Sequence, residues 1–134
     1  MNAIFDYDTT YLGPAFPILT LEIKSGISGK GENATGLIDT GSDATAVPHA
    51  ILQRIGARKL DSRWVRTINH VRYRTDVYVV SAVISAYLIP NIEAIANYDT
   101  EELIIGRDIL NQLVVTLDGF AQTTTIPINC PPQA

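Results

Sequence analysis

The segment from Gly36 to Thr45 contains the residues best suited to acid–base chemistry. Its apolar start predicts a strand that enters the protein interior and ends on the carboxylate of Asp39. A buried carboxylate is costly unless it is hydrogen-bonded or shares a proton with a neighbouring group. Thr40 offers a hydroxyl, and Gly41 permits close approach by backbone or ligand. Taken alone, an Asp-Thr-Gly sequence is more often an ordinary turn, so the surrounding residues must decide.

Two further features favour catalysis at this segment. Residues 42–45, Ser-Asp-Ala-Thr, follow directly, and Val47-Pro48 then begins a predicted helix. A distant segment, Leu103 to Leu110, has three apolar residues, then Gly106-Arg107, a polar residue and a hydrophobic pair. In order and spacing these motifs resemble the retropepsin family of aspartic peptidases, and the resemblance covers about residues 16–127.

The resemblance implies a role for each matching residue. Asp39 matches the catalytic aspartate, and Thr40 matches the residue whose hydroxyl bonds across to a partner subunit beneath the active site. Gly41 and Asp43 match positions that line the substrate groove. Arg107 matches an arginine that pairs with the second aspartate, which predicts an Asp43–Arg107 ion pair with bidentate orienting geometry. The alternative is a surface pair that contributes about 0–1 kcal/mol.

The number of catalytic carboxylates predicts a homodimer. Aspartic peptidase chemistry needs two carboxylates that share one proton, and the chain has a single Asp-Thr-Gly sequence. A second copy about a two-fold axis supplies the other Asp39. The pair then titrates as a unit. The expected partners are therefore a second copy of the chain and a peptide or protein substrate, and no cofactor or metal is implied.

The elements that must position Asp39 are mostly strands. Alternating apolar residues predict a strand over 16–24, a turn over 25–33 and a short strand over 34–39. A helix is expected from Pro48 to Gly56, as in cellular and bacterial members of the family rather than viral ones. The other expected elements are strands over 64–68, 71–81, 82–89 and 103–105, a helix over 107–113, and a hairpin around Asp118-Gly119.

These elements make one all-β domain, 1–134, with one or two short helices. The resemblance implies the retropepsin-like acid protease barrel. Residues 1–15 and 127–134 are expected to be terminal arms, and exposed strand edges there are natural dimer elements.

The resemblance also implies a hairpin flap over the substrate, at about residues 63–77. Its expected tip, residues 67–71, contains no glycine, unlike many relatives, and Asn69 is the residue able to adopt a left-handed turn conformation. Ile68, Asn69 and Val71 are candidate substrate contacts, as is Trp64. Packing within the strands is at least as good an explanation for the apolar ones.

Charge is placed unevenly along the chain. Seven of its ten basic residues lie between positions 54 and 74, where Asp61 is the only acidic residue. Such a patch favours acidic substrates through electrostatic steering, although a solvated hairpin face is the commoner meaning of such a charge pattern. A hydrolase triad of Ser42 with His49 or His70 lacks the expected sequence context.

The overall composition narrows the function classes. A net charge of −4 gives no reason to expect nucleic acid as a partner, and no apolar run approaches the roughly 20 residues of a membrane span. Cys130 is the only cysteine, which argues against a disulfide or a cysteine metal site. The N-terminus lacks signal-peptide features, so a cytoplasmic location is expected. The main alternative function is a catalytically weak or inactive dimerisation or peptide-binding module with the same fold, and a domain cut from a larger polyprotein is a further possibility.

Overall fold

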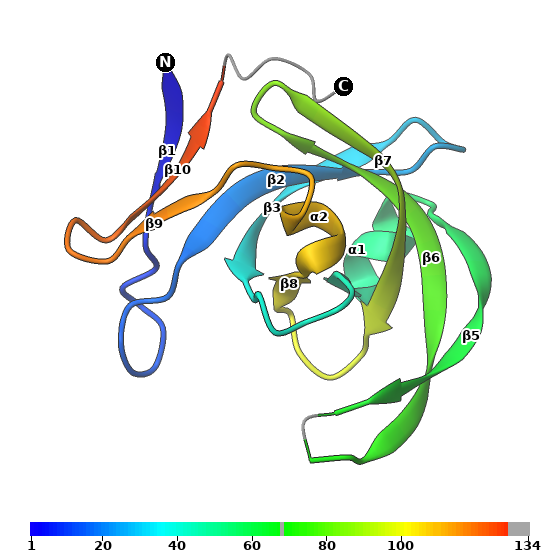
Figure 1. The fold of residues 1–134 in the computed structure, drawn as a ribbon. Coiled ribbons are helices and arrows are strands. Elements are labelled where there is room, and N and C mark those ends of the chain that lie inside the picture. The colour runs from blue at the N-terminus through cyan, green and yellow to red at the C-terminus, as the bar shows by residue number, and fades with distance from the viewer. Residues whose placement is uncertain (68, 129–134) are drawn as a thin grey trace.

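The computed structural model describes residues 1–67 and 69–128, which form ten strands and two short helices (Figure 1). The strands are β1 (Asn2–Asp6), β2 (Ile18–Lys24), β3 (Gly31–Ile38), β4 (Ala46–Pro48), β5 (Arg58–Arg66), β6 (Arg72–Ile84), β7 (Tyr87–Asn97), β8 (Leu103–Ile105), β9 (Thr116–Asp118) and β10 (Thr123–Pro127). The helices are α1 (His49–Arg54) and α2 (Arg107–Leu110). The prediction of an all-β domain with two short helices is confirmed.

Six of the strands close into a barrel. The larger sheet has the order β2-β3-β8-β4-β7-β6-β5, and an additional pairing of β2 with β6 joins the two sides. β5 therefore lies outside the closed ring and pairs with β6 alone among the described strands. A smaller sheet of β1, β10 and β9 lies beside the barrel (Figure 1).

The barrel core follows from the apolar pattern of the sequence. On β2, the side chains of Leu19, Leu21 and Ile23 are almost completely buried, while Thr20 between them is exposed. This alternation is that of a strand with one face on the core. On α1, Ile51 and Leu52 are buried, and Gly56 at φ 66° follows the helix in the left-handed conformation that favours glycine.

Two predicted strands have the wrong boundaries. The strand expected over 64–68 is β5, which already begins at Arg58. We expected residues 82–89 to end at Pro90, but the chain turns at Ser85-Ala86 and β7 continues through Pro90 to Asn97. Ser85 takes a left-handed conformation, φ 54°, in a turn without glycine or proline to announce it. Pro90 is tolerated because the β6–β7 register shifts there: Ala82 faces Ile89, while Val80 faces Ile92.

The first and last described strands pair with each other. β1 pairs antiparallel with β10, with Ala3 opposite Ile126. The first predicted arm therefore contains a strand rather than only irregular chain. Of the second arm, Pro127 belongs to β10 and residues 129–134 lie outside the described residues. None of the helices in the described ranges is both long enough and apolar enough to cross a bilayer.

Candidate active site

Asp39 lies at the end of a buried strand, in the first residue after β3. β3 runs parallel to β8, with Ile38 beside Ile105. The backbone N–H of Asp39 donates to the carbonyl of Ile105 across 3.0 Å, which extends the strand pairing by one bond. The side chain of Asp39 is half-buried. The sequence prediction of a strand that delivers this carboxylate to the edge of the core is confirmed.

A tight turn holds one oxygen of this carboxylate. The Gly41 N–H donates to Asp39 Oδ1 across 2.9 Å, and the Ser42 N–H donates to the Asp39 carbonyl across 3.2 Å. A Cβ atom on Gly41 would lie 3.2 Å from Oδ1, so the absence of a side chain lets this turn stay close. Within residues 1–67 and 69–128, no donor is bonded to the other oxygen, Oδ2. One half of the carboxylate is thus held while the other is open to a ligand or a second subunit.

Arg107 joins the turn to the start of α2. Its Nη1 donates to the carbonyl of Thr40 across 2.8 Å, and its Nη2 forms an ion pair with the carboxylate of Asp43. The structure therefore brings together the two residues predicted to pair, but through one nitrogen and one oxygen rather than in the expected bidentate geometry. Because the Asp43 side chain is 90% exposed, solvent screens the charge attraction and limits its contribution to about 0–1 kcal/mol. The main effect of Arg107 is to fix the backbone of the 40–43 turn.

A second pair beneath the turn was not foreseen from the sequence. The Thr45 hydroxyl donates to Asp108 Oδ1 across 2.7 Å, and the Thr45 N–H donates to Oδ2 across 3.0 Å. The Gly106 N–H in turn donates to the Thr45 hydroxyl oxygen across 3.2 Å. Thr45 is fully buried, so each of these bonds satisfies a group that water cannot reach. A polar residue within the apolar stretch 44–47 was the signal available in the sequence.

Gly106 allows the two motif segments to touch. A Cβ atom on this residue would lie 2.6 Å from both the carbonyl carbon and the carbonyl oxygen of Ala44. The Arg107 N–H then donates to the carbonyl of Ser42 across 2.9 Å. The Gly-Arg sequence is therefore a packing requirement, because only glycine lets α2 begin directly against the 42–45 backbone.

The predicted flap is the β5–β6 hairpin, whose tip has a different turn residue from the one expected. The Thr67 N–H donates to the Val71 carbonyl and the His70 N–H donates to the Thr67 carbonyl, both across 2.9 Å. The left-handed residue is His70, φ 62°, so the expectation for Asn69 is wrong. Asn69 and Val71 are exposed. No hydrogen bond in the described part of the chain joins this tip to the 39–45 turn, and Ile68 lies outside the described residues.

The base of the hairpin is anchored on Asp76. Its carboxylate accepts hydrogen bonds from the hydroxyls of Tyr98, at 2.6 Å, and Ser62, at 2.7 Å, and forms an ion pair with Lys59 at 3.1 Å. The hydrogen bond from Tyr98, then those from Ser62 and Lys59, lower the pKa of Asp76 from its ordinary 3.8 to about 2. The same bond to Asp76 raises the pKa of Tyr98. β5, β6 and the segment after β7 thus meet at one carboxylate.

Replacing Asp76 by asparagine should destabilise the protein at neutral pH. The pKa of Asp76 is lower in the folded protein than its ordinary value, so its stabilising effect is complete above about pH 4 and is lost as the pH falls through about 2. We expect the wild-type melting temperature to exceed that of Asp76→Asn at pH 6 and the difference to shrink towards pH 2. Asp99→Asn, which changes an exposed carboxylate near Tyr98, is the control. A difference that stays constant from pH 6 to pH 2 would contradict the low pKa.

The histidines do not form a hydrolase triad with Ser42. The His49 ring lies against Tyr98, with ring centroids 4.5 Å apart, and its Nε2 is 3.4 Å from the Tyr78 hydroxyl. The Ser42 hydroxyl donates to the carbonyl of Ala44 across 2.7 Å. His70 occupies the exposed hairpin turn. In the described ranges, no group of three or more histidine, cysteine or acidic side chains is arranged to hold a metal ion.

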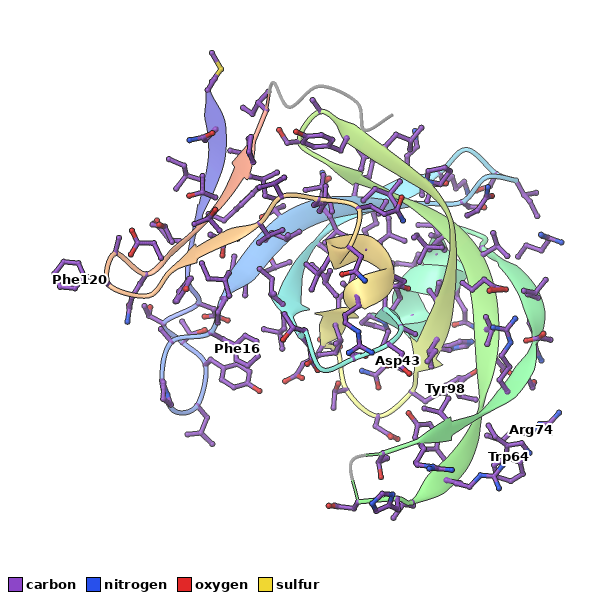
Figure 2. The ribbon with its side chains drawn as sticks, in the orientation of Figure 1. Phe16, Asp43, Trp64, Arg74, Tyr98 and Phe120 are labelled. Atoms are coloured by element: carbon purple, nitrogen blue, oxygen red, sulfur yellow. The ribbon has the colours of Figure 1, made fainter. Side chains whose placement is uncertain are left out.

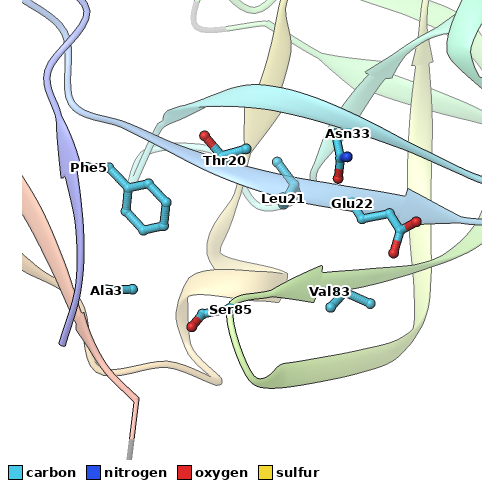
Figure 3. Close-up of a pocket in the computed structure, with 8 residues that line it drawn as sticks. All are labelled: Ala3, Phe5, Thr20, Leu21, Glu22, Asn33, Val83 and Ser85. Carbon is cyan, nitrogen blue, oxygen red and sulfur yellow. The ribbon is translucent and has the colours of Figure 1, made fainter. Parts of the chain in front are cut away.

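A cavity of about 400 Å³ lies away from Asp39, between β1 and the barrel strands β2, β3 and β6 (Figure 3). Its lining includes Phe5, Leu21 and Val83, with Glu22 as its ionisable side chain. It lacks the paired acid and base that hydrolysis requires. The Asp39 turn therefore remains the candidate for catalysis.

Asp39 thus follows a buried strand, and the Gly106-Arg107 start of α2 bonds to the turn that follows Asp39. The sequence model of the family described as "gag-polyprotein putative aspartyl protease" matches residues 25–112. The chain belongs to this family. The match spans both the Asp39 turn and the Gly106-Arg107 segment.

Solved structures with the same fold include a bacterial and a viral protease. A retropepsin-like aspartic protease from Rickettsia conorii aligns with a TM-score of 0.63 and 15% identity, over 94% of this chain and 90% of that one. The EIAV protease complexed with the inhibitor HBY-793 aligns with a TM-score of 0.56 and 23% identity, over 77% of this chain and 92% of that one. No curated protein sequence matches the chain. The structural likenesses confirm the retropepsin-like barrel predicted from the sequence.

Proposed function

We propose that the protein is an aspartic endopeptidase in which two copies of the chain each contribute Asp39. One carboxylate takes a proton from a water molecule, whose oxygen attacks the carbonyl carbon of the scissile amide. The other carboxylate donates its proton to the carbonyl oxygen. The first carboxylate then passes the proton it took from water to the leaving nitrogen. The C–N bond breaks as the carbonyl re-forms, and the carbonyl oxygen returns its proton to the second carboxylate.

The observation that carries this proposal is the state of the Asp39 carboxylate. Oδ1 is held by the Gly41 N–H, whereas no donor in the described part of the chain bonds to Oδ2. The Thr40 hydroxyl is exposed and also has no partner within the described ranges. A carboxylate oxygen and a hydroxyl that have no protein partner in the described ranges, on a chain with one Asp-Thr-Gly sequence, fit a half-site that a second copy completes.

Assembly from two half-sites should make activity depend on protein concentration. We expect cleavage of a peptide library between pH 3 and pH 7, with a specific activity that rises with protein concentration until the dimer is saturated. Below the dimer dissociation constant, the rate should increase with the square of the concentration. Analytical ultracentrifugation over the same range gives the monomer–dimer equilibrium independently. A specific activity that stays constant while the protein is monomeric would contradict the two-chain site.

The main alternative is a module that binds peptides without turnover. It predicts that a peptide retained by the dimer is recovered intact at every pH. Cleavage that requires Asp39 would exclude it.

A further inference from the structure

The β5–β6 hairpin carries three arginines around one tryptophan. Trp64 lies directly opposite Arg74, and Arg66 lies directly opposite Arg72. Opposite residues in an antiparallel pair lie on the same face, as do residues two apart on one strand. Trp64, Arg66, Arg72 and Arg74 therefore share one face, which we call the arginine face.

All four side chains of the arginine face are accessible. Trp64 is 59% exposed, and the three arginines are exposed as well. The guanidinium carbon of Arg72 lies 5.1 Å from the centre of the Trp64 ring, which is cation–π distance. This contact restrains the Arg72 guanidinium beside the Trp64 ring.

The arginines of this face lack the acidic partners that neighbouring cations have. Arg54 pairs with Glu32, and Lys59 pairs with Asp76. Arg63 pairs with both Asp61 and Glu93. None of Arg66, Arg72 and Arg74 forms one within residues 1–67 and 69–128.

The arginine face also places like charges next to each other. Arg66 and Arg72 lie directly opposite each other, and like charges in this arrangement destabilise a sheet. A binding partner that neutralises these charges would offset that cost.

Two residues of the arginine face lie at a distance from the turn that contains Asp43. Figure 2 shows Trp64 and Arg74 at the outer side of the hairpin, while Asp43 lies towards the centre of the molecule. Trp64 and Arg74 therefore lie apart from the turn that carries the candidate catalytic carboxylate. A ligand on this face has to be a segment of chain outside the cleavage site.

The chemistry of the face favours an acidic peptide over a nucleic acid. Guanidinium groups bind carboxylates in bidentate geometry, and the tryptophan adds an apolar surface for aromatic or aliphatic neighbours. The whole chain carries a net charge of −4, with a pI of about 5.0, so its field opposes a long polyanion. Three unpaired cations suit a few carboxylates, whereas nucleic-acid affinity grows with each phosphate neutralised.

We propose that the arginine face is an exosite that binds an acidic segment of a protein substrate, several residues away from the bond to be cut. The assignment of that ligand as a substrate rests on the proposed peptidase function. The exosite raises the local concentration of substrate near the hairpin and leaves the chemical step unchanged. It therefore lowers KM for acidic substrates without altering kcat.

A binding experiment tests the face without requiring catalysis. The Asp39→Asn protein is titrated into a fluorescein-labelled peptide containing a block of glutamates, and anisotropy gives the dissociation constant. Combining Arg66→Gln, Arg72→Gln and Arg74→Gln should weaken binding by about tenfold or more, and added salt should remove most of the difference. The control combines Lys24→Gln, Lys30→Gln and Arg58→Gln, which changes the net charge equally away from the face. Equal weakening by both triple variants would overturn the proposal.

A cleavage experiment then tests the substrate role. Matched peptides with and without a glutamate block beyond the cleavage site are compared by KM and kcat. In the wild type the acidic block should lower KM, and the arginine triple variant should lose that advantage while cleaving the neutral peptide normally. Absence of cleavage by the wild type would refute the peptidase function and leave the binding result standing. Tighter binding of a single-stranded oligonucleotide than of the acidic peptide, lost in the same variant, would overturn the acidic-peptide assignment.

Discussion

Asp39→Asn should lower kcat/KM for peptide cleavage by about 10²–10⁴-fold, the range that a positioned acid or base contributes. Asparagine has the shape of aspartate, and its amide oxygen can still accept the 2.9 Å hydrogen bond from the Gly41 N–H. The turn should therefore keep its conformation while both acid–base groups of the dimer are lost. Steady-state kinetics at several pH values measure the loss, and an unchanged melting temperature shows that the fold is intact.

Two controls separate loss of chemistry from loss of structure. Asp99→Asn changes an exposed carboxylate outside the 39–45 turn, and it should retain most activity. An excess of Asp39→Asn protein added to the wild type should suppress activity, because mixed dimers carry one carboxylate instead of two. Equal activity of wild type and Asp39→Asn would remove Asp39 from the mechanism.

Gly106→Ala should destabilise the protein by about 1–3 kcal/mol, the usual range for an added group in a packed site. The backbone of Gly106 has φ −93° and ψ −177°, which any residue can adopt, so the effect is purely steric. The added methyl group would lie 2.6 Å from the backbone of Ala44, and backbone cannot move aside as a side-chain end can. Moving α2 away from the 42–45 segment should also weaken the hydrogen bond from Arg107 to the Thr40 carbonyl and lower activity. Chemical denaturation and peptide cleavage measure the two effects.

Gly119→Ala is the matched control for this substitution. A Cβ atom at Gly119 meets nothing within 4 Å, so its stability should change by no more than about 0.5 kcal/mol. If Gly106→Ala were as stable as Gly119→Ala, the close contact between the two motif segments would not be important for stability.

The local pattern of the sequence predicted the core elements well. Alternating residues around Leu21 placed β2, and the apolar run before Asp39 placed the end of β3. Pro48 and Gly56 bracketed α1. Each of these signals acts within a few residues, so it can be seen without knowledge of the rest of the chain.

The missed features depend on contacts between distant residues. Asp108 binds Thr45 from 63 positions away, and no short-range pattern encodes that pairing. We expected a strand to end at Pro90, because proline lacks the backbone N–H that regular strand pairing needs. The register shift between β6 and β7 removes the need for that N–H. Ser85 and His70 adopt the left-handed conformation without the glycine that would indicate a turn in the sequence. The strand pairing on either side determines both turns.

The anchor at Asp76 has a consequence for how a pH–rate profile is interpreted. Ordinary carboxylates gain protons between about pH 5 and pH 3. With a pKa of about 2, Asp76 remains ionised across that interval, and its bonds to Tyr98, Ser62 and Lys59 persist. A fall in activity between pH 5 and pH 3 would therefore come from groups other than Asp76, while release of the hairpin would appear as a separate transition at lower pH.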